Sequence, residues 1–372
     1  MINNRLINTF LDLVKISSPS KNEIDIKNYI YNALKDYPLE IIEDTTGTNI
    51  NGNCGNLLIK LKANNHSRKK IAFDSHMDTV TPCDDVKTVV DGSIIKSDGT
   101  TILGGDDKIG VAIQLELIRE IIENQIEHCE LLFIFSVSEE EGLQGAKNLA
   151  INYYKDYDAI FVLDGEGIPG IFYHSAPYNC KGKIRVVGKA AHSGVNPEDG
   201  VNALYVASKA ISQLPIGRIN DFSTCNIGFI QGGVARNVVM PSVEMDFESR
   251  SLDLNFLQHF IGEVKKIFED VCSQNGAVFE DELSYGTPGY LIDDKSNVMV
   301  KLKNATDAAD LSFELMSCGG GSNANVYNSN NVVAVLVGVG MENIHSTKEY
   351  VDSNNIVKAY HLVREIVQEY SA

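Results

Sequence analysis

The sequence of 372 residues contains no run of about 18 apolar residues, the length that a membrane-spanning helix needs. Residues 1–16 alternate polar and apolar side chains at helical spacing and lack the continuous apolar core of a secretory signal peptide. The seven cysteines are odd in number, widely scattered and never in a Cys-x-x-Cys pair, which is typical of reduced thiols. These absences predict a cytoplasmic protein with no membrane partner.

Basic residues are also scarce, because 32 Lys and Arg stand against 50 Asp and Glu and give a net charge of -18. Such a charge repels the phosphates of nucleic acids, so we expect no nucleic-acid partner. Hydrophobic residues make up 44% and charged residues 22%, which is ordinary for a folded globular protein. The length exceeds what one compact core usually organises, so the sequence predicts two domains.

Possible metal ligands follow four apolar runs, at residues 71–74, 131–137, 159–163 and 332–339. Runs of this length are typical of buried strands, and parallel strands of an α/β sheet present ligands beyond their carboxyl ends in one crevice. Two histidines and three carboxylates suit zinc or a similar divalent ion, and they exceed what one tetrahedral site needs. The five candidate ligands are His76, Asp106 at the start of a predicted helix, Glu140, Asp164 and His345.

Two of these segments carry further side chains that fit hydrolytic chemistry. In FDSHMD, His76 and Asp78 face the same side of an extended backbone, so Asp78 can bind the second ring nitrogen of His76. In SEEEGLQGA, Glu139 stands next to Glu140, and metal-assisted hydrolysis requires one carboxylate to bind metal and another to move protons. When the glutamates are considered alone, a solvated acidic turn explains them better.

The pattern changes near residue 179 to strand, helix, strand, strand, helix, strand, and Gly286, Pro288 and Gly289 mark a turn back. We therefore expect a metal-binding catalytic domain formed by residues 1–178 and 286–372, with residues 179–285 inserted as a second domain. Within the first domain, residues 56–61 and 71–74 are predicted to form adjacent strands because only a polar turn separates them.

Seven segments resemble, in order and spacing, the M20 co-catalytic zinc peptidases, and within them the peptidase T-like aminopeptidases. The resemblance covers nearly the whole chain. It implies a mixed α/β sheet of the zinc-exopeptidase type flanked by helices, with an inserted ferredoxin-like α+β lid. The segments are FDSHMDTV, TILGGDDKIG, SVSEEEGLQGA, VLDG, GKAAHSGVNPEDGVNAL, GGVARNVV and NIHSTKEY.

The resemblance also implies two divalent metal ions, zinc with cobalt or manganese as alternatives, which Asp106 bridges. One ion would be held by His76, Asp106 and Asp164, and the other by Asp106, Glu140 and His345. Asp78 would orient His76, and Glu139 would be the general base.

In the family, a histidine of the smaller domain steadies the developing oxyanion, and His192 in AAHSG matches it. Arg236, Asn237 and Arg250 are expected to bind substrate, since a guanidinium can hold a carboxylate bidentately, although surface ion pairing would explain both arginines. Asn323, in the glycine-rich segment GGGSNANVY, stands where the family pattern has Asp. We therefore expect Asn323 to contact substrate without the negative charge that the family has at this position.

The function implied is a tripeptide aminopeptidase-like exopeptidase that acts on short peptides and forms a homodimer through the inserted domain. One alternative is an M20-type amidohydrolase acting on dipeptides or N-acyl amino acids. Another is a non-catalytic peptide-binding protein that retains the fold, but such a protein has no need of Glu139 beside two metals.

Overall fold

The computed structural model describes residues 2–372, with side chains from Asn4 onward. The chain forms two compact units. Unit 1 comprises the chain up to His174 together with Ile292–Ala372, and unit 2 comprises Ser175–Leu291. In the described part of the chain, no helix is both long enough and apolar enough to cross a membrane.

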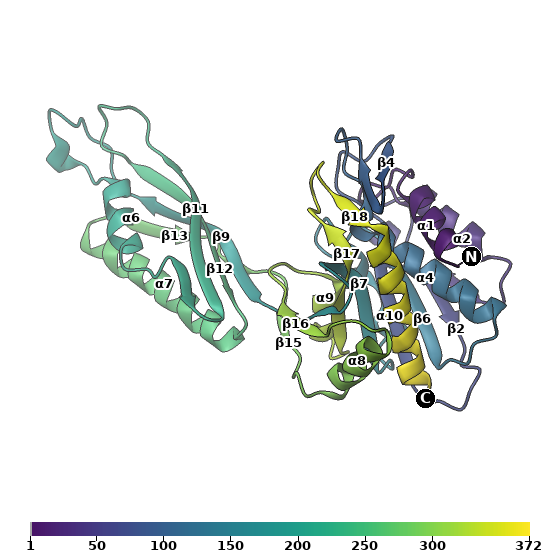
Figure 1. Cartoon of the computed structure of the whole chain (residues 1–372). Coiled ribbons are helices and arrows are strands. Elements are labelled where there is room, and N and C mark those ends of the chain that lie inside the picture. Colours follow the sequence, from purple (N-terminus) through teal and green to yellow (C-terminus); the bar gives the residue numbers. More distant parts are fainter. Residues whose placement is uncertain (1) are drawn as a thin grey trace. The chain divides into compact units, whose positions relative to one another are not determined.

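Unit 1 is built on a mixed sheet whose centre is parallel, as the sequence predicts (Figure 1). The central strands lie in the order β6 (Glu130–Ser136), β3 (Lys70–His76), β7 (Ala159–Glu166) and β17 (Ala334–Glu342). Beyond β6 lie the antiparallel strands β2 (Leu57–Leu61) and β1 (Glu40–Glu43). Beyond β17 lie β18 (Tyr350–Asp352), β5 (Ile94–Ser97) and β4 (Thr88–Asp91). Three further strands belong to the sheet but not to this linear order. Of these, β8 (Ile171–Ala176) pairs with β17, and β15 (Tyr290–Leu291) and β16 (Glu314–Ser317) pair with β8.

The prediction that residues 56–61 and 71–74 form adjacent strands is wrong, because β6 lies between β2 and β3. Leu57 of β2 pairs with Phe135, whereas Ile71 of β3 pairs with Leu131 on the other edge of β6. Strand β6 carries the run LLFIF and is buried throughout its length after Glu130, so it suits a central position with a neighbour on each edge.

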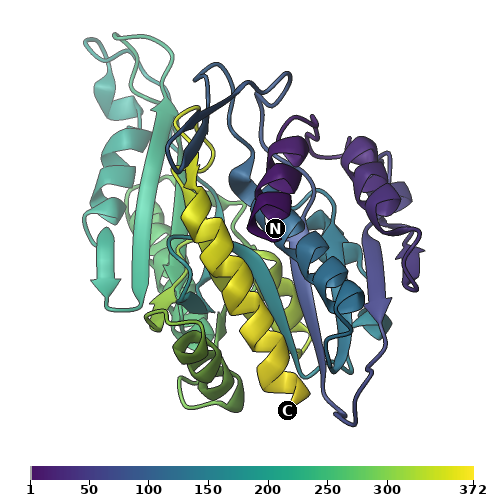
Figure 2. The same ribbon diagram turned by 45° about the vertical axis from the view of Figure 1, so that its right-hand side comes forward.

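Helices pack against this sheet and against one another (Figure 2). Helix α4 (Gly105–Glu123) contacts β3 and β7, α10 (Ser353–Ser371) contacts β17, and α9 (Asn323–Ser329) contacts both β7 and β17. Helix α1 (Ile2–Leu13) packs on α4, and α8 (Asn297–Ala308) packs on α10. The remaining helices of unit 1 are α2 (Ile24–Leu34), α3 (Thr46–Ile50), α5 (Gln144–Asn148) and the 3₁₀ turn Ile151–Tyr153.

Unit 2 is an antiparallel sheet covered by two helices, α6 (Ala203–Ile211) and α7 (Leu254–Gln274) (Figure 1). The sheet order is β10 (Gly217–Asn220), β11 (Ser223–Gly232), β12 (Ser242–Ser251), β9 (Tyr178–Val187) and β13 (Val278–Asp281), with β14 (Ser284–Tyr285) pairing β9. A short 3₁₀ turn, Pro197–Asp199, precedes α6. Both the chain order of strands and helices and the spatial order β13-β9-β12-β11 are ferredoxin-like, which confirms the predicted α+β insert.

Helix α7 illustrates how the sequence specifies this unit. The Asp253 side chain caps the helix by accepting N–H groups of Asn255 and Phe256 at 2.8 and 3.1 Å. Buried residues then recur at helical spacing along one face, at Leu257, Phe260, Ile261, Val264, Phe268, Val271 and Cys272. This face packs with α6 and the sheet into one hydrophobic core.

The core of unit 1 is centred on aromatic side chains of its parallel strands. Phe73 of β3 is fully buried, and its ring centroid lies 5.8 Å from that of Phe133 and 5.7 Å from that of Phe161. Because these three rings come from neighbouring strands, they hold together the strands that carry the candidate ligands.

We predict that Phe73→Ala lowers the free energy of unfolding of unit 1 by about 3–5 kcal/mol, through lost burial and the cavity left behind. Urea unfolding followed by circular dichroism measures this change. Tyr31→Ala is the matched control, because Tyr31 is 45% exposed, and it should have little effect. A loss below about 1 kcal/mol for Phe73→Ala would contradict this account of the core.

Candidate metal centre

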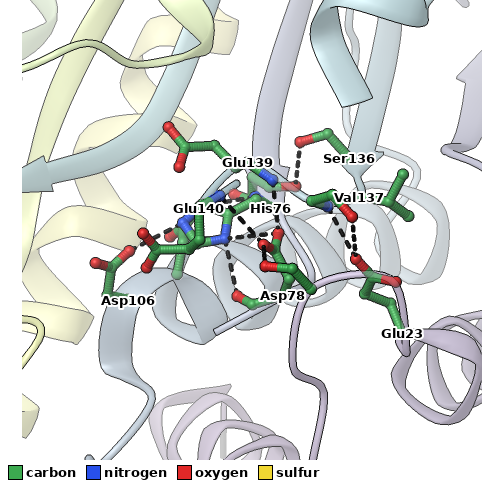
Figure 3. Close-up of polar contacts among 12 residues, drawn as sticks. Glu23, His76, Asp78, Asp106, Ser136, Val137, Glu139 and Glu140 are labelled. Carbon is green, nitrogen blue, oxygen red and sulfur yellow. Dashed lines mark hydrogen bonds and ion pairs between the residues drawn. The ribbon is translucent and has the colours of Figure 1, made fainter. Parts of the chain in front are cut away.

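The five candidate ligands lie together at the carboxyl end of the parallel strands. His76 is the last residue of β3, Glu140 follows β6, and Asp164 lies near the end of β7. His345 follows β17, and Asp106 lies at the start of α4. Figure 3 shows His76 surrounded by Asp106, Glu140 and Asp78. The geometry therefore brings together residues that are far apart in the sequence.

Asp106 lies between the two histidines of this cluster. Its Oδ1 atom is 2.9 Å from Nε2 of His76, and its Oδ2 atom is 3.2 Å from Nε2 of His345. Two oxygens of one carboxylate thus face two separate imidazole nitrogens. This is the arrangement that a carboxylate shared by two metal ions requires.

Each imidazole also faces a second carboxylate. Nε2 of His76 is 3.4 Å from Oδ1 of Asp164, and Nε2 of His345 is 2.9 Å from Oε1 of Glu140. Two sets of donors therefore share Asp106. They contain the same residues as the two ligand sets that the family resemblance implies.

Asp107 is a competing candidate, because one of its carboxylate oxygens lies close to donor atoms of His76 and Asp164. Both oxygens of Asp107 are, however, bonded to backbone. Oδ2 accepts the N–H of His76 and Oδ1 accepts the N–H of Gly110, each at 3.1 Å. Asp107 thus caps the regular part of α4 and holds the end of β3, and the bridging role of Asp106 stays a prediction.

The donor set fits divalent cations. Oε1 of Glu140 is buried, and Nε2 of His345 lies only 2.9 Å from it. Imidazole nitrogens with carboxylate oxygens match the preferences of zinc and related first-row ions.

The charges of the cluster also favour cations. The carboxylates of Asp106 and Glu140 raise the pKa of the His345 imidazole to about 10. Burial raises the pKa of the Asp164 carboxyl to about 7, and the charge of Asp106 adds to this shift. His345 is half exposed, whereas His76 is buried, so the cluster is open to solvent on the His345 side.

Asp78 lies beside the second ring nitrogen of His76 and contacts it with both its backbone and its carboxylate. Nδ1 of His76 lies 2.9 Å from the backbone carbonyl oxygen of Asp78 but 3.4 Å from its carboxylate oxygen Oδ1. The carboxylate also accepts the N–H of Glu139 at 2.9 Å and the N–H of Glu140 at 3.2 Å (Figure 3). Asp78 therefore orients the ring mainly through its backbone and holds the glutamate turn through its side chain.

Glu139 is buried beside the ligand cluster. Burial, followed by the charge of Asp164, raises the pKa of its carboxyl well above the ordinary value. A carboxylate with a raised pKa holds protons more readily near neutral pH, which suits a group that accepts and returns a proton.

Glu23 is a supporting residue that sequence reasoning missed. One oxygen of its buried carboxylate accepts the N–H groups of Lys21 and Ser138 and the hydroxyl of Ser138, each at 2.9 Å (Figure 3). Nearby, the Ser20 hydroxyl donates to Asp78 at 2.7 Å. The loop after α1 therefore braces the turn that carries Glu139. The position of Glu23 in the sequence did not indicate this role.

Asn323 is buried, and its side chain belongs to a polar network next to β3 and β6. Its amide nitrogen donates to Ser136 Oγ at 2.9 Å, and that hydroxyl donates to Asp74 at 3.0 Å. The Tyr327 hydroxyl donates to the other oxygen of Asp74 at 2.7 Å. An Asp at position 323 would need the Ser136 hydroxyl proton that Asp74 already accepts, so Asn suits this network. Contact of Asn323 with substrate stays a prediction.

The remaining candidates belong to unit 2 and fall in two places. His192 forms an isolated β-bridge with Val238, and the N–H of Ser193 donates to the Asn237 carbonyl at 3.0 Å, so His192 lies beside the segment with Arg236 and Asn237. Arg250 lies near the C-terminal end of β12, whereas the segment with Arg236 and Asn237 precedes the start of this strand. Arg250 is the strand partner of Asn179, and its side chain donates to Glu248 at 2.9 Å. Their catalytic and substrate-binding roles stay predictions.

Two protein families and one curated relative match large parts of the chain. The family described as Peptidase dimerisation domain matches residues 178–275, and the one described as Peptidase family M28 matches residues 56–196. The Bacillus subtilis protein YqjE, described as uncharacterized, is 37% identical over 98% of both chains.

Two solved structures are similar over almost the whole chain. Aminopeptidase PepT from Bacillus cereus has 36% identity and a TM-score of 0.96, with 100% of this chain and 99% of that chain covered. A tripeptidase from Staphylococcus aureus has 33% identity and a TM-score of 0.93, with 99% and 98% covered. With its ligand cluster and its dimerisation domain, the chain belongs to the M20/M28 metallopeptidase family and is peptidase T-like.

Proposed function

We propose that this protein is an exopeptidase that uses two divalent metal ions to remove the N-terminal residue from short peptides, tripeptides above all. The observation that carries the proposal is the Asp106 carboxylate, whose two oxygens face the imidazoles of His76 and His345. Similarity over the full chain to an aminopeptidase and a tripeptidase supports the choice of substrate.

In this proposal the two sets of donors around Asp106 hold the ions, with zinc preferred and cobalt or manganese as alternatives. Bound there, the ions supply Lewis-acid polarisation of the scissile carbonyl and a water whose pKa falls to about 7. Asp106 keeps the two sets of donors at a fixed separation. His76 is in turn held from both sides, by the Asp78 carbonyl at its ring and by Asp107 at its backbone.

Glu139 moves the proton in this scheme. It takes a proton from the attacking water and returns it to the departing amine. Its backbone N–H is fixed by Asp78, and the preceding residue, Ser138, is fixed by Glu23, so the backbone that carries the carboxylate is held in place before substrate arrives. Such preorganisation is what a proton-transfer group needs.

Unit 2 contributes substrate contacts and the dimer interface in this proposal. His192 stabilises the developing oxyanion, and Arg236, Asn237 and Arg250 bind the peptide, with Asn323 of unit 1 beside the site. The match of residues 178–275 to a peptidase dimerisation domain supports a homodimer through this unit.

We expect metal to stabilise the protein, because an ion that binds only the folded state shifts the unfolding equilibrium. Adding zinc to chelator-treated protein should raise the melting temperature, measured by differential scanning calorimetry. The same addition to His76→Ala should have a smaller effect, because that variant lacks a ligand. An unchanged melting temperature in the unsubstituted protein would contradict the proposed metal centre.

Glu139→Gln should abolish peptide hydrolysis while leaving zinc content unchanged, because glutamine cannot accept the proton and Glu139 is not a proposed ligand. Turnover of a tripeptide and metal content by mass spectrometry are measured on the same sample. Glu141→Gln is the matched control, since Glu141 is exposed and forms an ion pair with Lys21. Near-normal turnover by Glu139→Gln would remove this role from Glu139.

A substrate panel separates the proposed activity from its alternatives. Tripeptides, dipeptides and acetylated amino acids are assayed with zinc, cobalt or manganese. We expect fastest hydrolysis of tripeptides with a free N-terminal amine. Preference for a blocked amine would instead indicate an amidohydrolase, and metal-loaded protein that hydrolyses none of them would indicate a binding protein.

A further inference from the structure

Glu349 is a buried carboxylate outside the proposed ligand sets. It lies four residues after His345, in the segment that connects β17 to β18, and its side chain is 1% exposed. A carboxylate is seldom buried unless specific partners satisfy it. The partners of Glu349 therefore indicate what it does.

The side chain of Glu349 accepts hydrogen bonds from the backbone around the start of α4. Oε2 accepts the N–H groups of Leu103 and Gly104, each at 2.8 Å. Oε1 accepts the N–H of Asp106 at 3.1 Å. One side chain thus fixes the backbone of the residue that is proposed to bridge the two metals.

These bonds connect segments that are distant in the sequence. Glu349 is 243 residues from Asp106 and only four from His345. Since Asp106 and His345 face each other across 3.2 Å, a carboxylate that joins their two segments sets the separation of two proposed ligands.

The sequence around this contact is adapted to it. A side chain at Gly105 would place its Cβ 2.9 Å from Oε1 of Glu349 and 3.0 Å from Val351 Cγ1, so glycine permits the close approach. The accepted N–H groups belong to the residues that lead into α4, where a negative charge is favourable. A neutral glutamine would present an NH₂ group to at least one of these donors.

We propose that Glu349 is a positioning residue that fixes Asp106 relative to His345 and thereby sets the affinity of the paired metal site. The inference rests on the proposed metal centre and extends it to a residue that touches neither metal nor substrate. Partners that orient metal ligands from outside the ligand set typically change metal affinity by about 10–100-fold when they are removed.

The test is a competition titration of zinc against a chromophoric chelator, using the full-length protein and its Glu349→Gln variant. We expect the variant to bind zinc about 10–100-fold more weakly at one or both sites. Glu342→Gln is the matched control, because Glu342 ends β17 on the same segment and should leave zinc affinity unchanged. The KM for a tripeptide at saturating zinc should also stay unchanged in Glu349→Gln, since Glu349 does not bind substrate.

Wild-type zinc affinity in folded Glu349→Gln would overturn the inference, even if its melting temperature fell, because that result indicates a structural role alone. If Glu349→Gln does not fold, Gly105→Ala tests the same contact from the other side, and wild-type zinc affinity in that variant would overturn the inference too. Absence of zinc binding in the unsubstituted protein would instead overturn the proposed metal centre itself, so the two failures are distinguishable.

Discussion

The position of the Asp106 carboxylate is the constraint on which the site depends. Its two oxygens face His76 from β3 and His345 from the segment after β17, so one side chain connects the ends of two strands. If Asp106 moved by the width of an atom, the two sets of donors would no longer share a ligand. Much of the surrounding structure can be understood as holding this carboxylate and its histidines in place.

That support comes mostly from buried carboxylates that accept backbone N–H groups. Asp107 holds His76 and the start of α4, and Asp78 holds the turn of Glu139 and Glu140. Glu23 and Glu349 hold the neighbouring segments in the same way. A carboxylate has several acceptor positions and no donor when ionised, so it can fix a loop whose N–H groups have no strand or helix partner.

The strand-end pattern predicted the ligand cluster because it depends on local features, namely apolar runs followed by donors, and on the general geometry of parallel sheets. The α/β fold with its ferredoxin-like insert followed from the same pattern and from the family resemblance. The supporting contacts could not be predicted, because Glu23 and Ser138 are 115 residues apart and Glu349 and Leu103 are 246 apart. The order of β2, β6 and β3 was missed for the same reason, since strand pairing is not local.

The most direct test of a shared Asp106 is the position of the ions themselves. Crystals of the zinc-loaded protein, measured at the zinc absorption edge, give anomalous difference peaks that locate each ion. The account predicts two peaks about 3.5–4 Å apart, with one oxygen of Asp106 directed at each. A single peak, or two peaks joined through Asp107 with Asp106 directed elsewhere, would contradict it.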